Sequence, residues 1–192
     1  MLMDVEQSVL SNIFKRQHRL FSMNTGMNIL KKETKMPKCI MLVGVPASGK
    51  STWCRTKIIT YVASTDNIIS EVASNYGMTY DEGFKELIGF ADKVMWRTIN
   101  ACMMRQLDFT IDRTNLTVKS RKKFIDKLKL HRYEIECWVF PLPGSESLPT
   151  EEWNRRLDSR RGKTIPAHVL SSMIEHYEVP TEAEGFSKII FL

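Results

Sequence analysis

The segment GVPASGKST at residues 44–52 constrains the fold of this chain more than any other feature of its sequence. It fits the pattern G-x-x-x-x-G-K-[ST], follows the apolar run Cys39–Val43, and leads into a stretch of helical character at Gly49–Ile59. A strand, a glycine-rich turn and a helix bring backbone N–H groups and the positive end of a helix dipole to phosphate oxygens. The segment therefore predicts a P-loop that holds a nucleoside triphosphate.

Each residue of the predicted P-loop has an expected role. Gly44 and Gly49 are expected where the backbone takes a positive φ or approaches a phosphate closely. Lys50 is expected to bridge the β- and γ-phosphates, and the Ser51 hydroxyl is expected to be a Mg²⁺ ligand. The expected nucleotide contacts are Gly44, Ala47, Ser48, Gly49, Lys50, Ser51 and Thr52. The motif alone does not separate a kinase from a GTPase, a motor or an inert binder.

From Lys38 onward, short apolar runs alternate with helical segments, which predicts one α/β domain with a parallel sheet. We expect strands at 39–43, 61–64, 109–112, 133–140 and 187–192, and helices at 49–59, 66–75, 80–106, 118–130, 149–161 and 166–176. The helix at 80–106 is expected to bury one face formed by Phe84, Ile88, Ala91, Met95, Ile99 and Cys102.

Residues 1–36 differ from the rest of the chain. Apolar residues at helical spacing predict an amphipathic helix at Asp4–Phe21, and a linker without clear periodicity follows it. We therefore expect an N-terminal extension at 1–36 and a kinase-like domain at 37–192.

Composition sets broad limits on function. The net charge of +6 and the pI of about 9.2 favour polyanionic partners such as nucleic acid. The four cysteines are far apart and form no Cys/His cluster, which argues against a structural zinc site. No apolar run approaches the roughly 20 residues that span a bilayer, and the N-terminus has no signal pattern. The expected location is cytoplasmic, and the sequence leaves an oligomer open.

Two aspartates follow predicted strands. Asp66 comes after YVAST, and Asp112 comes after FTI. Because ligands of open parallel sheets sit beyond the carboxyl ends of the strands, both carboxylates are expected to face the P-loop. One could accept the proton of an attacking hydroxyl, and one could hold the Mg²⁺ shell. The alternative is that either aspartate only caps a helix. The guanine motif of GTPases and the long Walker B strand of motor ATPases are both absent from the sequence.

A basic cluster in EEWNRRLDSRRGK could form a lid over the transferring phosphate. Its cations are Arg155, Arg156, Arg160, Arg161 and Lys163. The spacing places Arg156 and Arg160 one turn apart on a helix that Gly162 ends. The alternative is a solvated charged face whose arginines pair with local carboxylates. A second basic stretch, KSRKKFIDKLKLHR at 119–132, is either a set of nucleic-acid phosphate contacts or a surface helix with its apolar residues inward.

Five pieces of the sequence resemble one family: GVPASGKSTW, STD, TIDRTNLTVKSRKK, RRGKTIP and VPTEAEGFSKI. In order and spacing, residues 38–192 resemble the kinase domain of phage and animal polynucleotide 5′-hydroxyl kinases. They also resemble the kinase-like domain of heterogeneous nuclear ribonucleoprotein U. The resemblance implies a P-loop kinase fold with five parallel strands in the order 2-3-1-4-5 and a helical lid. It also implies transfer of the γ-phosphate of ATP·Mg²⁺ to a 5′-hydroxyl of DNA or RNA.

The resemblance also implies roles for individual residues. Asp66 matches the general base that contacts the substrate hydroxyl, and Asp112 matches an aspartate near the phosphates and the metal ion. Arg161 matches the catalytic lid arginine, with Arg156 as its nucleotide-binding companion. The matched substrate-side residues are Asn115, which with Thr114 shapes a turn, and Arg121.

The sequence departs from the family in two ways. Phage enzymes carry an arginine three residues after the base, where this chain has Ile69. This chain has no D-x-D-G-T motif, so 3′-phosphatase activity is not expected. The first departure keeps open a small acceptor, such as a nucleoside or the nucleotide sugar of zeta-toxin-like kinases. A non-catalytic nucleotide- or RNA-binding domain is the other alternative, against which the intact Asp66, Lys50 and Ser51 argue.

Overall fold

The computed structural model describes residues 35–57, 61–160 and 162–192. The chain divides into two compact units, Met1–Lys35 and Met36–Leu192, and the fold described below is that of the second unit. The amphipathic helix predicted at Asp4–Phe21 and the linker after it lie outside the described residues.

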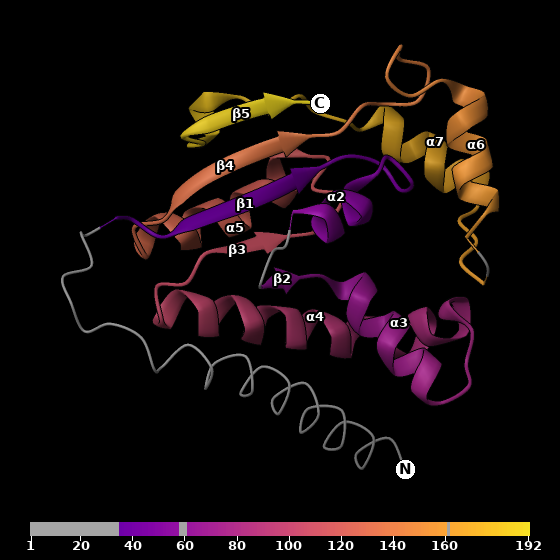
Figure 1. Ribbon diagram of the computed structural model, residues 1–192, viewed down its shortest axis with the longest axis horizontal. Helices are drawn as coiled ribbons and strands as arrows, with labels where there is room; N and C mark the ends of the chain where they lie inside the picture. Colours follow the sequence, from indigo (N-terminus) through magenta and orange to yellow (C-terminus); the bar gives the residue numbers. More distant parts are fainter. Residues whose placement is uncertain (1–34, 58–60, 161) are drawn as a thin grey trace. The chain divides into compact units, whose positions relative to one another are not determined.

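The core of the domain is a five-stranded sheet in which every pairing is parallel (Figure 1). The strands are β1 (Lys38–Val43), β2 (Val62–Ala63), β3 (Phe109–Ile111), β4 (Glu134–Val139) and β5 (Lys188–Phe191). Their order is β2-β3-β1-β4-β5, which confirms the predicted order. The central strand β1 has Cys39 opposite Phe109 of β3 and Met41 opposite Cys137 of β4.

The strands form where the sequence has short, nearly continuous apolar runs, because a parallel sheet is covered on both faces. Met41, Leu42 and Val43 of β1 are fully buried, and all three residues of β3 are buried. The strands therefore hold their carboxyl ends, where the predicted site residues lie, on a rigid apolar base.

Helices connect the strands. They are α2 (Lys50–Thr56), α3 (Thr65–Asn75), α4 (Tyr80–Met104), α5 (Val118–Leu130), α6 (Thr150–Asp158) and α7 (Ala167–Glu175), and a 3₁₀ turn, η1, covers Glu182–Glu184. The crossover through α2 runs toward one edge of the sheet, and the crossover through α5 runs toward the other. Right-handed crossovers in opposite directions place these two helices on opposite faces. None of the helices in the described ranges is long and apolar enough to cross a membrane.

Two expectations about the helices are wrong. The predicted helix at 149–161 is shorter, because α6 ends at Asp158 with Ser159 as its C-cap. Arg160 therefore lies beyond α6 and does not share a helix face with Arg156. Phe84 of α4 is 42% exposed rather than buried. The buried position beside it is Gly83, where an added Cβ would lie 2.8 Å from the Cβ of Ala73 on α3. The close α3–α4 contact rotates Phe84 outward.

Both α6 and α7 lie beyond the carboxyl ends of the strands (Figure 1). Their position depends on an apolar cluster of Val45, Leu116, Leu148 and Trp153, against which residues of α6 and α7 pack. The Trp153 indole Nε1 donates a hydrogen bond of 2.8 Å to the Pro46 carbonyl of the P-loop. Helix α6, which carries part of the segment predicted to form a lid, is thus attached directly to the phosphate-binding segment.

Candidate active site

The loop at 44–50 has the backbone geometry that a phosphate cradle requires. A Cβ on Gly44 would lie 2.8 Å from both the Phe140 Cβ and the Ser48 Oγ, so no side chain fits at this position. Gly49 caps α2 with a φ of 110°, in the left-handed region that favours glycine. Ala47 also has a positive φ, of 61°. Such conformations turn successive N–H groups toward one point, as anion binding needs.

The Lys50 ammonium is buried inside this loop. Its Nζ donates to the carbonyls of Gly44 and Val45, both at 2.7 Å. Burial lowers the pKa of Lys50 to about 8, while the charges of Asp112 and Asp66 act in the opposite direction. The side chain is therefore a cation held next to two carboxylates, with backbone carbonyls as its present partners.

Asp112 and Ser51 form an oxygen pair at the mouth of the loop. The Ser51 hydroxyl donates to Asp112 Oδ2 at 3.4 Å, and the Asp112 backbone N–H donates to the Ala63 carbonyl of β2. Burial raises the pKa of Asp112, and Lys50 opposes this rise. A hydroxyl and a carboxylate are the hard oxygen donors that Mg²⁺ prefers, so this pair fits the predicted metal ion.

Neither aspartate is a helix cap. Ser64 is the N-cap of α3, and its hydroxyl accepts the Asn67 N–H at 3.3 Å. Thr117 is the N-cap of α5, the next helix after Asp112. The cap-only alternatives are therefore wrong, and both carboxylates are free for other contacts.

The Asp66 carboxylate instead bonds to two side chains from distant segments. The Tyr80 hydroxyl donates to Oδ1 at 2.9 Å, and the Lys163 ammonium donates to Oδ2 at 2.5 Å. Burial would raise the pKa of Asp66, but Lys163 and Tyr80 lower it overall. The Asp66 side chain is 51% exposed, so its ionised carboxylate is accessible to a substrate.

The lid arginines differ in their contacts. Arg156 donates from Nε to Glu152 at 2.7 Å, and its Nη1 lies 3.9 Å from the position that a Cβ on Gly49 would take. Arg160 has a buried Nη1 for which the described residues offer no hydrogen-bond partner, and its charge lowers the pKa of Lys50 and of Asp66. Arg161, the predicted catalytic arginine, lies outside the described residues.

Two residues expected on the substrate side are buried in the protein. Arg121 has no exposed side-chain surface, and it forms a bidentate ion pair with Glu184 at 2.7 and 2.9 Å. It also donates to three backbone carbonyls, those of Asn115, Leu116 and Glu178. The expected substrate contact of Arg121 is therefore corrected to a structural one, since each of the three nitrogens of its guanidinium group already has a partner in the protein.

The same correction applies to Asn115. It is 3% exposed, and its side-chain amide donates to the Leu42 carbonyl at 2.8 Å. Its φ of 49° turns the chain between β3 and α5. Asn115 shapes this turn, as one part of the prediction held, and its amide does not reach a substrate.

The basic stretch at 119–132 forms α5 with Phe124, Ile125 and Leu128 buried. Its lysines lie outside: Lys122 pairs with Asp126, and Lys127 sits 4.9 Å from the Trp96 ring centroid. This arrangement is that of a surface helix with its apolar face inward.

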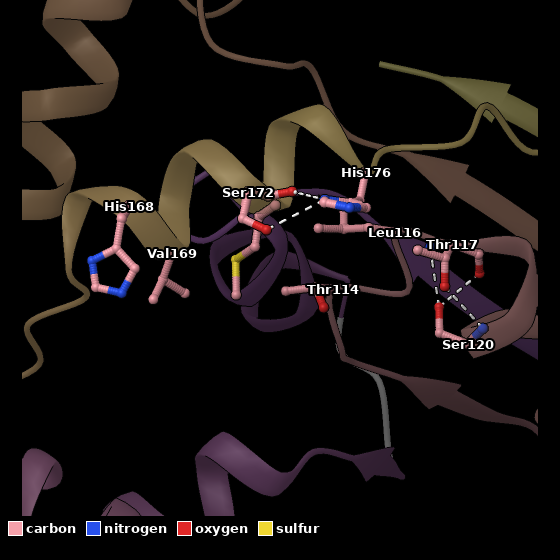
Figure 2. A pocket seen from close by; sticks show the side chains of 9 residues that line it. Thr114, Leu116, Thr117, Ser120, His168, Val169, Ser172 and His176 are labelled. Atoms are coloured by element: carbon pink, nitrogen blue, oxygen red, sulfur yellow. Dashed lines mark hydrogen bonds between the residues drawn. The ribbon is translucent and has the colours of Figure 1, made fainter.

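A groove of about 410 Å³ lies between α7 and the segment that follows β3 (Figure 2). Thr114, Thr117 and Ser120 line it on one side, and His168 and His176 of α7 line it on the other. The Thr114 carbonyl accepts the Gly44 N–H at 3.0 Å, so the groove begins at the back of the P-loop.

Sequence reasoning missed the groove, and it missed the roles of Tyr80 and Lys163. Lys163 counted only as one charge of a basic cluster, and Tyr80 only as the start of a helix. The fragment RRGKTIP, which carries part of the family resemblance, was the available signal for Lys163. No local pattern pointed to Tyr80.

Comparisons with known proteins identify a family and related folds. Residues 39–180 match the AAA domain family. The bifunctional polynucleotide phosphatase/kinase of Schizosaccharomyces pombe is 26% identical over 158 residues, which cover 82% of this chain and 34% of that protein. This chain thus spans about a third of the length of that relative.

Solved structures share the fold. A candidate kinase from Chloroflexus aurantiacus aligns with a TM-score of 0.59 at 17% identity, covering 83% of this chain and 86% of that one. A chain of the Pnkp1/Rnl/Hen1 RNA repair complex aligns with a TM-score of 0.55 at 24% identity, covering 77% and 46%. These likenesses show that this chain shares their fold. Because the family match extends over most of the 192 residues, this chain belongs to the AAA domain family.

Proposed function

We propose that this protein transfers the γ-phosphate of ATP to the 5′-hydroxyl of a polynucleotide, DNA or RNA, with Mg²⁺ as the metal ion. The observation that carries the proposal is that two carboxylates just beyond neighbouring strands have different partners. Asp112 accepts a hydrogen bond from the P-loop serine, whereas Asp66 accepts its bonds from Tyr80 and Lys163. A protein that only binds nucleotide has use for the first carboxylate, whereas a phosphotransferase needs both.

The metal ion would be held by Ser51 and Asp112, and when bound it would neutralise charge on the β- and γ-phosphate oxygens. Lys50 would exchange the carbonyls of Gly44 and Val45 for phosphate oxygens. Asp66 would accept the proton of the attacking hydroxyl. The acceptor oxygen then forms its bond to the γ-phosphorus as the bond to the β–γ bridging oxygen breaks, and ADP leaves.

Arg156 and Arg160 would contribute positive charge to the same reaction. Within residues 35–57, 61–160 and 162–192, the buried Nη1 of Arg160 has no hydrogen-bond partner, which is costly unless a ligand supplies the acceptor. An oxygen of the transferring phosphoryl group is the natural acceptor, because charge on its equatorial oxygens is what arginines stabilise. We assign this role to Arg160 among the described lid residues, and Arg161 stays a prediction.

A polynucleotide acceptor is supported by the resemblance of the five sequence pieces and by the S. pombe relative, whose name includes polynucleotide kinase. The net charge of +6 agrees with a polyanionic substrate.

Transfer of labelled γ-phosphate from ATP to a 5′-hydroxyl oligonucleotide tests the proposal, with single-stranded DNA and RNA in parallel. We expect Asp66→Asn to lose about a hundredfold or more in transfer rate while it still binds ATP. Asp126→Asn is the control, because Asp126 is an exposed carboxylate in a surface ion pair with Lys122. Unchanged turnover in Asp66→Asn would contradict the assignment of the base.

One observation favours a second candidate, a kinase for a small alcohol. Ile69, which stands where phage enzymes carry an arginine, is fully buried and lies against Gly83 of α4. The Ile69 side chain therefore does not reach a substrate phosphate. If labelled phosphate goes to a nucleoside or a nucleotide sugar and to no oligonucleotide, this candidate replaces the first.

A further inference from the structure

The Asp66 carboxylate is held on both oxygens before any substrate arrives. Tyr80 is the first residue of α4, fourteen positions after Asp66, and it bonds to Oδ1. Lys163 lies shortly after the end of α6, 97 positions after Asp66, and its ammonium donates to Oδ2. We call Tyr80 and Lys163 together the Asp66 clamp.

The two members of the clamp also contact each other. The Lys163 ammonium lies 3.8 Å from the centroid of the Tyr80 ring, within the range of a cation–π interaction. Lys163 is only 15% exposed, so this contact is shielded from water. The ring therefore helps to hold the ammonium at the carboxylate.

Backbone bonds join the chain segments on either side of the clamp. The Asp81 N–H donates to the Gly162 carbonyl at 3.1 Å, and the Asp81 carboxylate accepts the Thr164 N–H at 2.9 and 3.1 Å. The neighbours of Lys163 are thus bonded to the neighbour of Tyr80. The segment at 162–164 is seated on the start of α4 by its backbone as well as by its side chain.

The clamp leaves the carboxylate usable. Each carboxylate oxygen accepts about two hydrogen bonds, and each member of the clamp uses one of them. The remaining acceptor positions lie on a side chain that is 51% exposed. An incoming hydroxyl therefore meets a carboxylate that is already fixed in direction, which is what a positioned base requires.

We propose that Tyr80 and Lys163 are positioning residues, which fix the Asp66 carboxylate for the acceptor hydroxyl, and that Asp81 seats the lid segment so that Lys163 reaches it. This inference rests on the proposed function of Asp66 as the base. It concerns how that base is oriented, for either acceptor class.

Charged groups other than the clamp also face Asp66. Arg160 lowers its pKa, as the clamp does, and Asp66 is electrostatically coupled to Lys50 and Asp112 across the site. Removal of one clamp member therefore leaves other charges in place, and the pKa of Asp66 should rise while the carboxylate stays ionised at neutral pH. A lower rate at neutral pH then reflects a change in the orientation of the Asp66 carboxylate rather than a change in its protonation.

The test compares Tyr80→Phe, Lys163→Met and Lys163→Arg in the full-length chain. Loss of one hydrogen bond to the carboxylate should lower kcat about tenfold in Tyr80→Phe and Lys163→Met, with KM for ATP unchanged. The acidic limb of the pH–rate profile should move to higher pH in both variants, and Lys163→Arg should restore part of the rate. Tyr76→Phe and Lys85→Met are the controls, since both residues are exposed and neither contacts the site.

A carbon-13 NMR titration of the Asp66 carboxyl group, with thermal unfolding of each variant, gives a readout that needs no turnover. A rise in the pKa of Asp66 in Tyr80→Phe and Lys163→Met supports the clamp. An unchanged pKa in both variants overturns it, and so does a raised pKa with an unchanged kcat. If the native chain phosphorylates no acceptor, the proposed function fails, whereas the titration still decides whether the clamp holds Asp66.

Discussion

The proposed phosphate-donor side of the candidate site, which is the loop at 44–50, and the proposed acceptor side around Asp66 are built in different ways. On the donor side, Lys50 contacts Gly44 and Val45, which are six and five positions away in the chain. On the acceptor side, Asp66 contacts Tyr80 and Lys163, which are 14 and 97 positions away. A contiguous motif encodes the first side, and tertiary packing assembles the second.

This difference follows from what each side needs. A phosphate cradle is a backbone conformation, so two glycines and a helix start nearly specify it. Orientation of a carboxylate needs donors on two sides, and no short segment supplies both. The lid segment that carries Lys163 is placed by Trp153 on the P-loop and by Asp81 on α4, so the acceptor side depends on the donor side for its own geometry.

The largest effect is expected for a substitution of Arg121. The family resemblance places this residue on the acceptor side, whereas the structure places it in the protein interior. Arg121→Met leaves Glu184 and three carbonyls without their donor, so we expect a loss of about 3–5 kcal/mol in the free energy of unfolding. Urea denaturation measures this loss.

Arg113→Met is the matched control for this prediction. Arg113 also pairs with a carboxylate, that of Asp92, but the two side chains are 27% and 42% exposed. Its loss should cost below about 1 kcal/mol. A stable Arg121→Met protein that no longer binds an oligonucleotide would return Arg121 to the acceptor side.

Substitution of Arg160 tests whether the lid segment that carries Lys163 also contacts the transferring phosphoryl group. Its buried Nη1, which has no partner in the part of the chain that the structure describes, should bind a phosphoryl oxygen. Arg160→Gln should therefore lower kcat about a hundredfold with folding unchanged. The control is Arg155→Gln, because the Arg155 side chain is 78% exposed and pairs with Glu152. Equal rates in the two variants would remove Arg160 from the site. Steady-state transfer kinetics measure both.

The smallest effect is a pH dependence confined to the donor side. Because the pKa of Lys50 is lowered to about 8 in the free protein, the ammonium loses its proton above that pH, and phosphate oxygens lose their cation. ATP affinity should therefore be flat below about pH 7 and fall about tenfold by about pH 9. Titration calorimetry across this range measures it. A Lys50→Arg protein that binds ATP should show no such fall, and a flat profile in the native chain would contradict the shifted pKa.

Much of the fold could be predicted from the sequence. The strand order is confirmed, and the helix expected at 118–130 is confirmed at both ends. Thr117 and Ser120 cap its N-terminal end reciprocally. The lid helix was predicted to extend three residues beyond its observed end, since its charged residues continue the helical pattern past Asp158 while the chain turns toward α4. The spacing of charged residues does not show where the backbone leaves a helix to form a tertiary contact.

The sequence by itself determined the P-loop, the parallel sheet and the two aspartates beyond its strands, because each depends on residues that are neighbours in the chain or on the regular geometry of strands. Only the tertiary structure decided that Arg121 is interior, that Arg160 has a buried group without a partner among the described residues, and that Tyr80 and Lys163 hold Asp66. The physical reason is that a hydrogen bond or ion pair forms wherever packing brings a donor to an acceptor, and packing joins segments whose separation along the chain leaves no local pattern.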